Sequence, residues 1–87
     1  MLKEHTAMSE QAILKTVQTI ISQVTGKQRI GLETDFIKDL QLNSFDIMNI
    51  VCAFEDHYEV TVPTRDIWQM QQVQDVVTYI KDLGIDS

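Results

Sequence analysis

Apolar residues recur every three or four positions in three separate stretches of the chain, and this spacing constrains the fold more than any other feature. The three apolar sets are Ile13, Val17, Ile20, Ile21 and Val24, then Ile47, Ile50, Val51, Phe54 and Tyr58, and last Val73, Val76, Val77, Ile80 and Leu83. Such spacing places each set on one face of a helix. It predicts helices at about residues 9–25, 44–58 and 73–83.

Capping and turn-forming residues agree with these boundaries. Ser9 can cap the first helix, Gly26 can end it, and Gly84 follows the last one. Pro63 introduces a short helix at about residues 65–70. Val, Thr and Tyr in the last segment favour strands, but the three-and-four spacing there indicates a helix. We therefore expect an all-α fold, a small up-and-down bundle of three main helices plus one short helix, with no strand.

The length of 87 residues leaves room for one small hydrophobic core and little space for a closed catalytic pocket. We expect a single domain over residues 1–87, with residues 1–8 as a loose extension and residues 84–87 as a tail. The N-terminal residues do not resemble a signal peptide, and no stretch is long enough to span a membrane. Cys52 is alone and allows no internal disulfide. These features predict a monomeric cytoplasmic protein without membrane insertion.

Thirteen acidic residues against seven basic ones give a net charge of −6. Nucleic acid is a poor partner for such a chain, because binding phosphate needs clustered Lys and Arg. An acidic surface instead steers basic protein partners and makes association sensitive to salt. The acids gather around the second helix, which contains no Lys or Arg: Asp39, Asp46, Glu55, Asp56 and Glu59. They form a solvated face, a docking surface, or both.

The connection between residues 26 and 43 is longer than helical bundles usually need. Its apolar side chains are expected to hold it against the helices: Ile30, Leu32, Phe36, Ile37, Leu40 and Leu42. A long, anchored loop that ends at a helix N-terminus is a plausible place for a functional group. Ser44 occupies that position, directly after the cap residue Asn43, with Asp46 completing the first turn.

Residues 39–46, Asp-Leu-Gln-Leu-Asn-Ser-Phe-Asp, resemble the attachment site of the acyl carrier proteins, where a serine carries a phosphopantetheine arm. The resemblance continues through residues 55–63 and 73–80 and covers about residues 9–83. It implies that Ser44 binds the cofactor, 4'-phosphopantetheine, and that a phosphopantetheinyl transferase delivers it from coenzyme A. A helix N-terminus suits the phosphodiester, because its free N–H groups and dipole favour negative charge. No catalytic residue and no metal site are expected.

The resemblance also implies a docking surface for acyl-loading and acyl-processing enzymes that carry basic patches. The candidate docking residues are Asn43, Phe45, Asp46, Met48, Cys52, Glu55 and Asp56. Phe45 replaces the leucine that commonly follows the serine, a side chain that contacts partners in the family. Phe45, Cys52 and Ala53 lie off the core face of the helix, so we expect a small exposed apolar strip beside the acids.

Three positions depart from the family pattern. Asn43 replaces the usual aspartate before the serine, and Asn49 replaces a glutamate common in the second helix of fatty-acid carriers. Gln72 stands where a threonine often caps the fourth helix, which should weaken the start of that helix. Fatty-acid carriers shelter an acyl chain between their helices, and the residues expected to line such a space here are Ile47, Val51, Phe54, Val77 and Ile80.

The resemblance implies an acyl carrier that holds acyl thioesters for fatty-acid, polyketide or related biosynthesis, without catalysis of its own. Two alternatives stay open: an aminoacyl or peptidyl carrier, for example a D-alanyl carrier, and an unmodified acidic adaptor that binds basic partners. A thiol catalyst is disfavoured, because Cys52 and His57 are five residues apart and point to different helix faces. A calcium-binding loop at residues 35–46 is excluded, because this segment lacks the turn glycine and the final glutamate of such loops.

Overall fold

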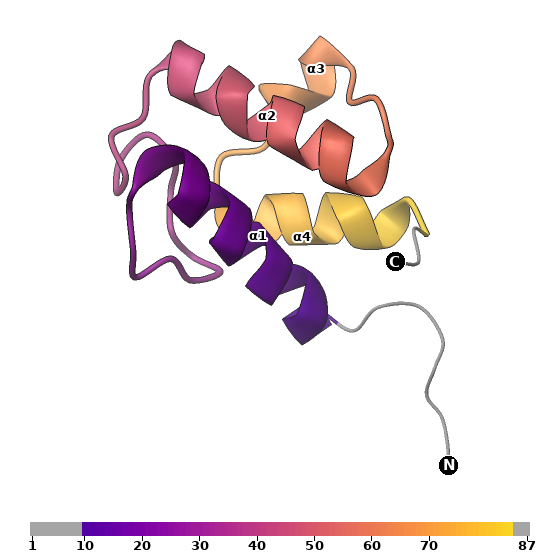
Figure 1. Ribbon diagram of the computed structural model, residues 1–87, viewed down its shortest axis with the longest axis horizontal. Helices are drawn as coiled ribbons and strands as arrows, with labels where there is room; N and C mark the ends of the chain where they lie inside the picture. Colours follow the sequence, from indigo (N-terminus) through magenta and orange to yellow (C-terminus); the bar gives the residue numbers. More distant parts are fainter. Residues whose placement is uncertain (1–9, 85–87) are drawn as a thin grey trace.

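The computed structural model describes residues 10–84 of the chain. These residues form four helices and no strand: α1 (Glu10–Thr25), α2 (Ser44–Tyr58), α3 (Thr64–Ile67) and α4 (Val73–Asp82). The all-α bundle of three main helices and one short helix is confirmed (Figure 1). Ser9, the expected cap of α1, lies outside the described residues, as do the expected extension at residues 1–8 and most of the expected tail.

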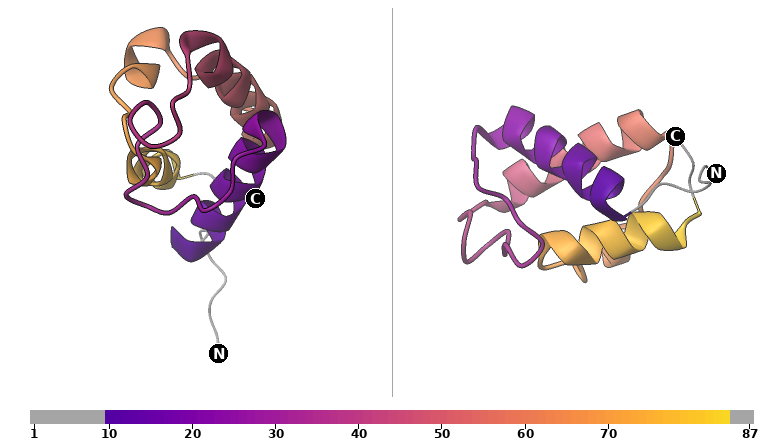
Figure 2. Two further views of the ribbon diagram at one scale, coloured as in Figure 1. Left: turned by 90° about the vertical axis from the view of Figure 1, so that its left-hand side faces the viewer. Right: turned by 90° about the horizontal axis from the view of Figure 1, so that it is seen from below.

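The hydrophobic core lies between the three main helices, where α1 packs against both α2 and α4 (Figure 2). The buried helical residues repeat the spacing seen in the sequence: Ile13, Val17, Ile20 and Ile21, then Ile50, Phe54 and Tyr58, then Val73, Val76, Val77 and Ile80. Each such side chain stabilises the fold by about 1.5–3 kcal/mol when it is removed from water. Leu83, expected on the apolar face, is instead 47 % exposed, because α4 ends one residue earlier, at Asp82.

The long connection at residues 26–43 lies along one side of the bundle, at the left of Figure 1. Ile30, Phe36, Leu40 and Leu42 are buried, as expected, and Leu32 is half-buried. Ile37 is 55 % exposed, so the expectation that it holds the loop is wrong. Its neighbour Phe36 turns inward, within a tight turn in which the Asp35 carboxylate accepts hydrogen bonds from the N–H groups of Ile37 and Lys38.

Backbone hydrogen bonds tie this connection to the start of α4. The N–H of Val73 donates to the carbonyl of Thr34 at 3.0 Å, and the N–H of Gln74 donates to that of Leu32 at 2.8 Å. One residue pair of the two segments, Asp35 and Gln72, forms an isolated antiparallel bridge. The long connection is therefore held in two ways, by backbone hydrogen bonds to the start of α4 and by its own side chains in the core. Both hold the segment that leads into α2.

The short helix α3 follows Pro63 and is less extensive than the predicted segment at residues 65–70. After Ile67 the chain tightens into turns, in which the N–H groups of Gln69 and Met70 bond three residues back. Ile67 is the one buried residue of α3. A side-chain hydrogen bond joins α3 to α4, from the hydroxyl of Tyr79 to Oδ2 of Asp66 at 2.8 Å.

Candidate functional site

The start of α2 is closed by residues of its own sequence. Oδ1 of Asn43 accepts a hydrogen bond from the backbone N–H of Asp46 at 2.8 Å, and Oδ2 of Asp46 lies 3.4 Å from the N–H of Asn43. Asn43 has extended backbone angles, as an N-cap requires. This reciprocal capping box defines Ser44 as the first residue of α2 and holds its backbone in the helical conformation.

Ser44 is exposed, and its hydroxyl makes no hydrogen bond with the residues that the structure describes. The N–H groups of Ser44 and Phe45 also lack an acceptor within residues 10–84, since the Asn43 side chain accepts from the N–H of Asp46 and its carbonyl from that of Ile47. Unsatisfied N–H groups at a helix start, together with the helix dipole, favour negative charge. The position thus combines an accessible nucleophilic oxygen with a local environment that suits an anionic group.

The segment before the cap is anchored on both sides of Gln41. Leu40 and Leu42 are buried, and the N–H of Leu42 donates to the carbonyl of Phe36 at 3.0 Å. Gln41 between them has φ +57°, in the left-handed region of backbone conformation, which residues other than glycine adopt only at a cost in free energy. The left-handed residue thus lies between two buried leucines, directly before the segment that leads into Asn43 and α2.

One face of α2 beyond Ser44 is exposed. Phe45 is 73 % exposed, Met48 is 38 % exposed, and Cys52 is exposed one helical repeat further on. The spacing of three and four residues places them on one side of the helix. With two further exposed residues they form what we call the exposed α2 face: Phe45, Met48, Asn49, Cys52 and Asp56.

Three α2 residues that we expected on its outer surface are half-buried. Ala53, expected off the core face, is half-buried and packs against the core, because it lies one position further round the helix than Cys52. Asp46 is half-buried and bonded within the capping box. Glu55 is half-buried, and its Oε2 accepts a hydrogen bond from the backbone N–H of Val62 at 2.9 Å. Sequence reasoning missed this bond, because nothing in the local pattern signals a partner seven residues away.

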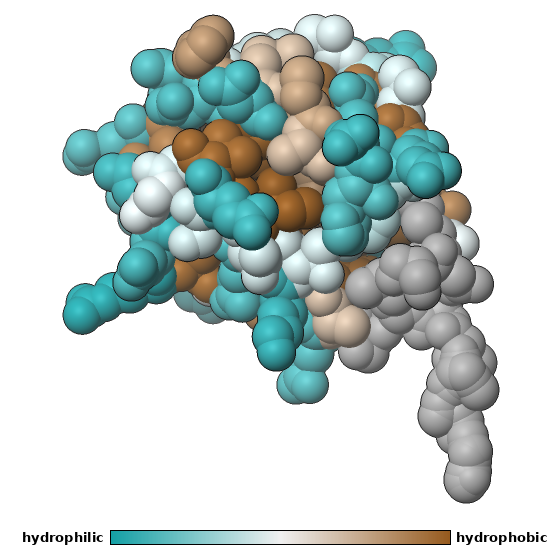
Figure 3. Space-filling model, in the orientation of Figure 1, coloured by the Kyte–Doolittle hydropathy of each residue, from teal (hydrophilic) through white to brown (hydrophobic). Residues whose placement is uncertain are grey.

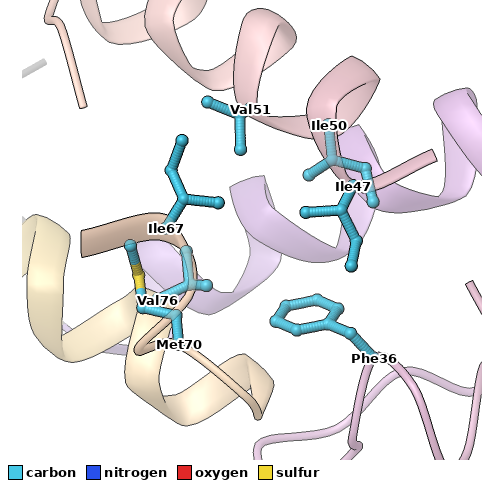
Figure 4. Close-up of a pocket in the computed structure, with 7 residues that line it drawn as sticks. All are labelled: Phe36, Ile47, Ile50, Val51, Ile67, Met70 and Val76. Carbon is cyan, nitrogen blue, oxygen red and sulfur yellow. The ribbon is translucent and has the colours of Figure 1, made fainter. Parts of the chain in front are cut away.

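Two small apolar cavities lie between α2, α4 and the segment at residues 59–72, which contains α3. The first has a volume of about 40 Å³ and is lined by Phe36, Ile47, Ile50, Val51, Ile67, Met70 and Val76, whose side chains converge in Figure 4. The second, also about 40 Å³, is lined by Val51, Phe54, Tyr58, Val60, Val62, Met70, Val76, Tyr79, Ile80 and Leu83. Val77, expected in such a lining, lines neither cavity. Phe36, Ile67 and Met70 were missed, because they lie outside the main helices.

Titratable groups near these features show three pKa shifts. Hydrogen bonds from the N–H of Lys38 and, less strongly, from that of Ile37 hold the pKa of Asp35 below its ordinary value. Burial raises the pKa of Tyr58. Partial burial, followed by the hydrogen bond to Asp66, raises the pKa of Tyr79. Both hydroxyls are therefore protonated at neutral pH, and that of Tyr79 can donate.

Hydrophilic side chains cover most of the surface seen in Figure 3, around a hydrophobic area near its middle. None of the helices within residues 10–84 is long and apolar enough to span a membrane. The described part of the chain also holds no group of three His, Cys, Asp or Glu side chains placed to bind a metal ion.

Four helices with an exposed serine at the start of α2 are the arrangement that the sequence led us to expect of a carrier domain. The family model described as the phosphopantetheine attachment site matches residues 15–80, which is more than half of the chain. The chain therefore belongs to the acyl carrier protein family, whose prosthetic group is phosphopantetheine.

Individual relatives agree with this assignment. An acyl carrier protein of Akkermansia muciniphila is 34 % identical over 76 residues, which cover 85 % of this chain and 95 % of the relative. A meromycolate extension acyl carrier protein of Mycobacterium leprae is 35 % identical over 79 residues, which cover 88 % of this chain and 69 % of the relative.

A solved structure shows the same fold. A putative acyl carrier protein from Mycobacterium tuberculosis superposes with a TM-score of 0.76, covering 82 % of this chain and 97 % of that one. The sequence identity between them is 19 %, so this likeness concerns the fold alone.

Proposed function

We propose that Ser44 carries the phosphopantetheine arm and that this chain presents acyl groups on it as thioesters. One observation carries the proposal: within the matched segment, the exposed Ser44 hydroxyl lies at the first position of α2 and makes no hydrogen bond with residues 10–84. The transferase reaction joins Ser44 Oγ to the phosphorus of the arm. The serine proton leaves, and coenzyme A gives up its adenosine bisphosphate portion.

The surroundings of Ser44 fit this group. The N–H groups of Ser44 and Phe45 are the donors that would hold the negative charge of the phosphodiester, assisted by the dipole of α2. The arm supplies a terminal thiol, which forms the thioester with the cargo. Asn43 and Asp46 keep the helix start in place, so that the attachment point stays exposed.

The protein's own contribution is presentation rather than catalysis. A tether keeps the cargo at high effective concentration near whichever enzyme is docked. Docking must also be weak enough for release, which suits exposed charges and a small apolar strip rather than a large interface. The lone exposed Cys52 suits a reducing compartment, and we propose a cytoplasmic monomer.

The exposed α2 face is the docking surface of this proposal. Phe45, Met48 and Cys52 offer an apolar strip, and Asp56 adds negative charge for the basic patches of the transferase and of acyl-loading and acyl-processing enzymes. Asn43 flanks Ser44 and is exposed as well. Asp46 and Glu55 share in the negative potential, while their hydrogen bonds also support the helix start and the following loop.

The cargo class follows from the interior of the bundle. Both cavities beside α2 are apolar, and Ile47, the first α2 residue to line one of them, lies three positions after Ser44. The apolar space available to an acyl chain bound to the arm therefore lies close to the attachment point. This supports fatty-acid or related biosynthesis as the setting.

Intact mass spectrometry tests the attachment site. The protein is incubated with coenzyme A, magnesium and a broad-specificity phosphopantetheinyl transferase, and we expect the wild type to gain one arm. Ser44→Ala should gain none, whereas the control Thr64→Ala, which removes an exposed hydroxyl from the start of α3, should gain the arm normally. An unmodified wild type, or an arm on another serine in the wild type, would overturn the assignment.

Transfer kinetics test the docking surface. Phe45→Ala and Asp56→Asn should each raise the KM for the carrier with little change in kcat, because the two side chains lie on the exposed α2 face. Asp82→Asn removes an equally exposed acid from the end of α4 and serves as the control. Equal KM values for Asp56→Asn and Asp82→Asn would mean that only net charge matters and that the face has no special role.

A further inference from the structure

The two cavities are too small to hold an acyl chain as they stand. Each measures about 40 Å³, whereas a dry apolar cavity of roughly 150 Å³ is the size that admits a benzene molecule. They share Val51, Met70 and Val76, so these three side chains form the partition between them. An acyl chain of several methylenes can enter only if part of the wall moves.

The wall segment with the weakest anchorage is α3. It has four residues, and Ile67 is the single buried one, whereas α1 and α4 each bury four. Thr64 and Arg65 are exposed, and Asp66 is half-buried. Ile67 lines the first cavity, and Met70, just after α3, lines both. Displacing α3 together with Met70 would therefore open both cavities while exposing the buried Ile67 and the half-buried Met70.

One side-chain hydrogen bond joins α3 to another helix within residues 10–84. The hydroxyl of Tyr79, on α4, donates to Oδ2 of Asp66 at 2.8 Å in a partly buried position. The other polar contact of the Asp66 side chain in the described part of the chain is with the neighbouring Arg65 at 4.0 Å, and it reaches no other helix. Tyr79 also lines the second cavity, so the bond lies at the edge of the space that must open.

We propose that Tyr79 and Asp66 form a latch that holds α3 over the cavities and sets how readily an acyl chain enters the bundle. The inference rests on the proposed carrier function and adds a determinant of cargo retention. With the latch closed, Ile67 and Met70 keep the cavities small and separate. When it opens, α3 and Met70 move outward and the two cavities join. Tyr79 is thus a positioning residue, acting through Asp66 on α3.

Thermal unfolding of the holo form and of the octanoyl-loaded form tests the latch. Octanoyl coenzyme A and the transferase load the cargo, and intact mass confirms each form. Tyr79→Phe, which keeps the ring, should lower the Tm of the holo form by about 4 °C or more. It should lower the Tm of the octanoyl form by less than half as much, because the latch is already open there. The rise in Tm caused by the octanoyl group is therefore larger in the variant.

Variants of Asp66 and a core variant separate the latch from a general loss of stability. Asp66→Ala should behave like Tyr79→Phe, and Asp66→Asn should recover most of the wild-type behaviour, since its amide oxygen still accepts the hydrogen bond. Ile13→Val trims a buried side chain of α1 that lines neither cavity, so it should lower the Tm of both forms equally. If Tyr79→Phe also lowers both equally, the latch is wrong.

Two further outcomes separate failure of the latch from failure of the carrier function. If the octanoyl group raises the Tm of neither the wild type nor Tyr79→Phe, although both are loaded, the latch is wrong. The attachment to Ser44 would be unaffected by that result. If no form gains an arm, the carrier proposal fails instead. Amide hydrogen exchange in the unloaded protein then still decides on the latch: residues 67–70 should exchange faster in Tyr79→Phe than in Ile13→Val, and equal rates would contradict it.

Discussion

The starts of α2 and α4 have the same capping hydrogen bond but differ in exposure: Ser44 is exposed and Val73 is buried. In both, an aspartate at the third helical position accepts from the backbone at the cap: Asp46 from Asn43, and Asp75 from Gln72. The start of α2 remains exposed, with the N–H groups of Ser44 and Phe45 unsatisfied among the described residues. The local capping pattern alone therefore does not identify a functional helix start.

At α4, tertiary contacts occupy every group that α2 leaves open. The N–H groups of Val73 and Gln74 donate to carbonyls of the long connection, and Val73 is fully buried. Asp75 accepts from both Gln71 and Gln72 at 3.0 Å. We expected Gln72 to weaken this helix start, but Asp75 and the long connection supply the hydrogen bonds that cap it. The difference teaches that a helix start is available for chemistry when no other segment packs on it.

The largest expected effect is the loss of stability when the capping aspartates of α2 and α4, Asp46 and Asp75, are replaced in turn. Asp75→Ala removes two hydrogen bonds at a helix start that the loop also packs on, so it should lower the free energy of unfolding by about 1–2 kcal/mol. Asp46→Ala removes one long bond and leaves the Asn43 cap intact, so its cost should stay below about 0.5 kcal/mol. Urea unfolding of both variants gives the comparison. Equal losses would mean that α2 depends on its capping box as strongly as α4 does.

The second prediction changes the charge at the open helix start. Asn43→Asp should leave the Tm nearly unchanged, because Asn and Asp are near-equivalent N-caps. It should speed arm transfer by a generic transferase severalfold at low salt, since an exposed charge mainly alters encounter, and the gain should shrink as salt rises. Transfer rates across a salt series provide the measurement. A slower Asn43→Asp at every salt concentration would show that the transferase reads the amide itself.

The third prediction uses pH to loosen the segment that packs on α4. The pKa of Asp35 is lowered in the folded protein, so its stabilising effect is present above its ordinary value of 3.8 and is lost as pH falls through the folded pKa. Asp35→Asn removes this dependence. Between neutral pH and pH below 3.8, the wild type should therefore lose more stability than Asp35→Asn, as measured by urea unfolding. Parallel losses would show that ionisation of Asp35 does not stabilise the fold.

The smallest expected effect concerns the backbone that leads to α2. Gln41→Gly relieves a left-handed conformation that costs about 1 kcal/mol, but it also adds about 0.4–1 kcal/mol of chain entropy to the unfolded state. The Tm should rise by at most a few degrees, with the transfer rate unchanged. Gln28→Gly, at an exposed loop position without positive φ, should lower the Tm. A lower Tm for Gln41→Gly as well would mean that the Gln41 side chain stabilises the site.

The sequence by itself determined the helices and the start of α2. Apolar spacing identifies the inner face of each main helix, because residues three and four apart share a side whatever packs against it. The capping box needs only residues three apart, Asn43 and Asp46, so the place of Ser44 as the first residue of α2 follows from local chemistry. The resemblance to the acyl carrier proteins rests on that same local segment and on the order of the segments around it.

Only the tertiary structure decided which of these features meet. Ile37, Ala53 and Leu83 depart from expectation because periodicity gives a direction on a helix or loop but not what lies opposite. The cavity walls combine Phe36, α3 and α4, and the bond between Tyr79 and Asp66 spans thirteen residues. Such contacts depend on how closely whole elements approach each other. That distance is set by the packing of all side chains in the core together, and no single segment of the sequence records it.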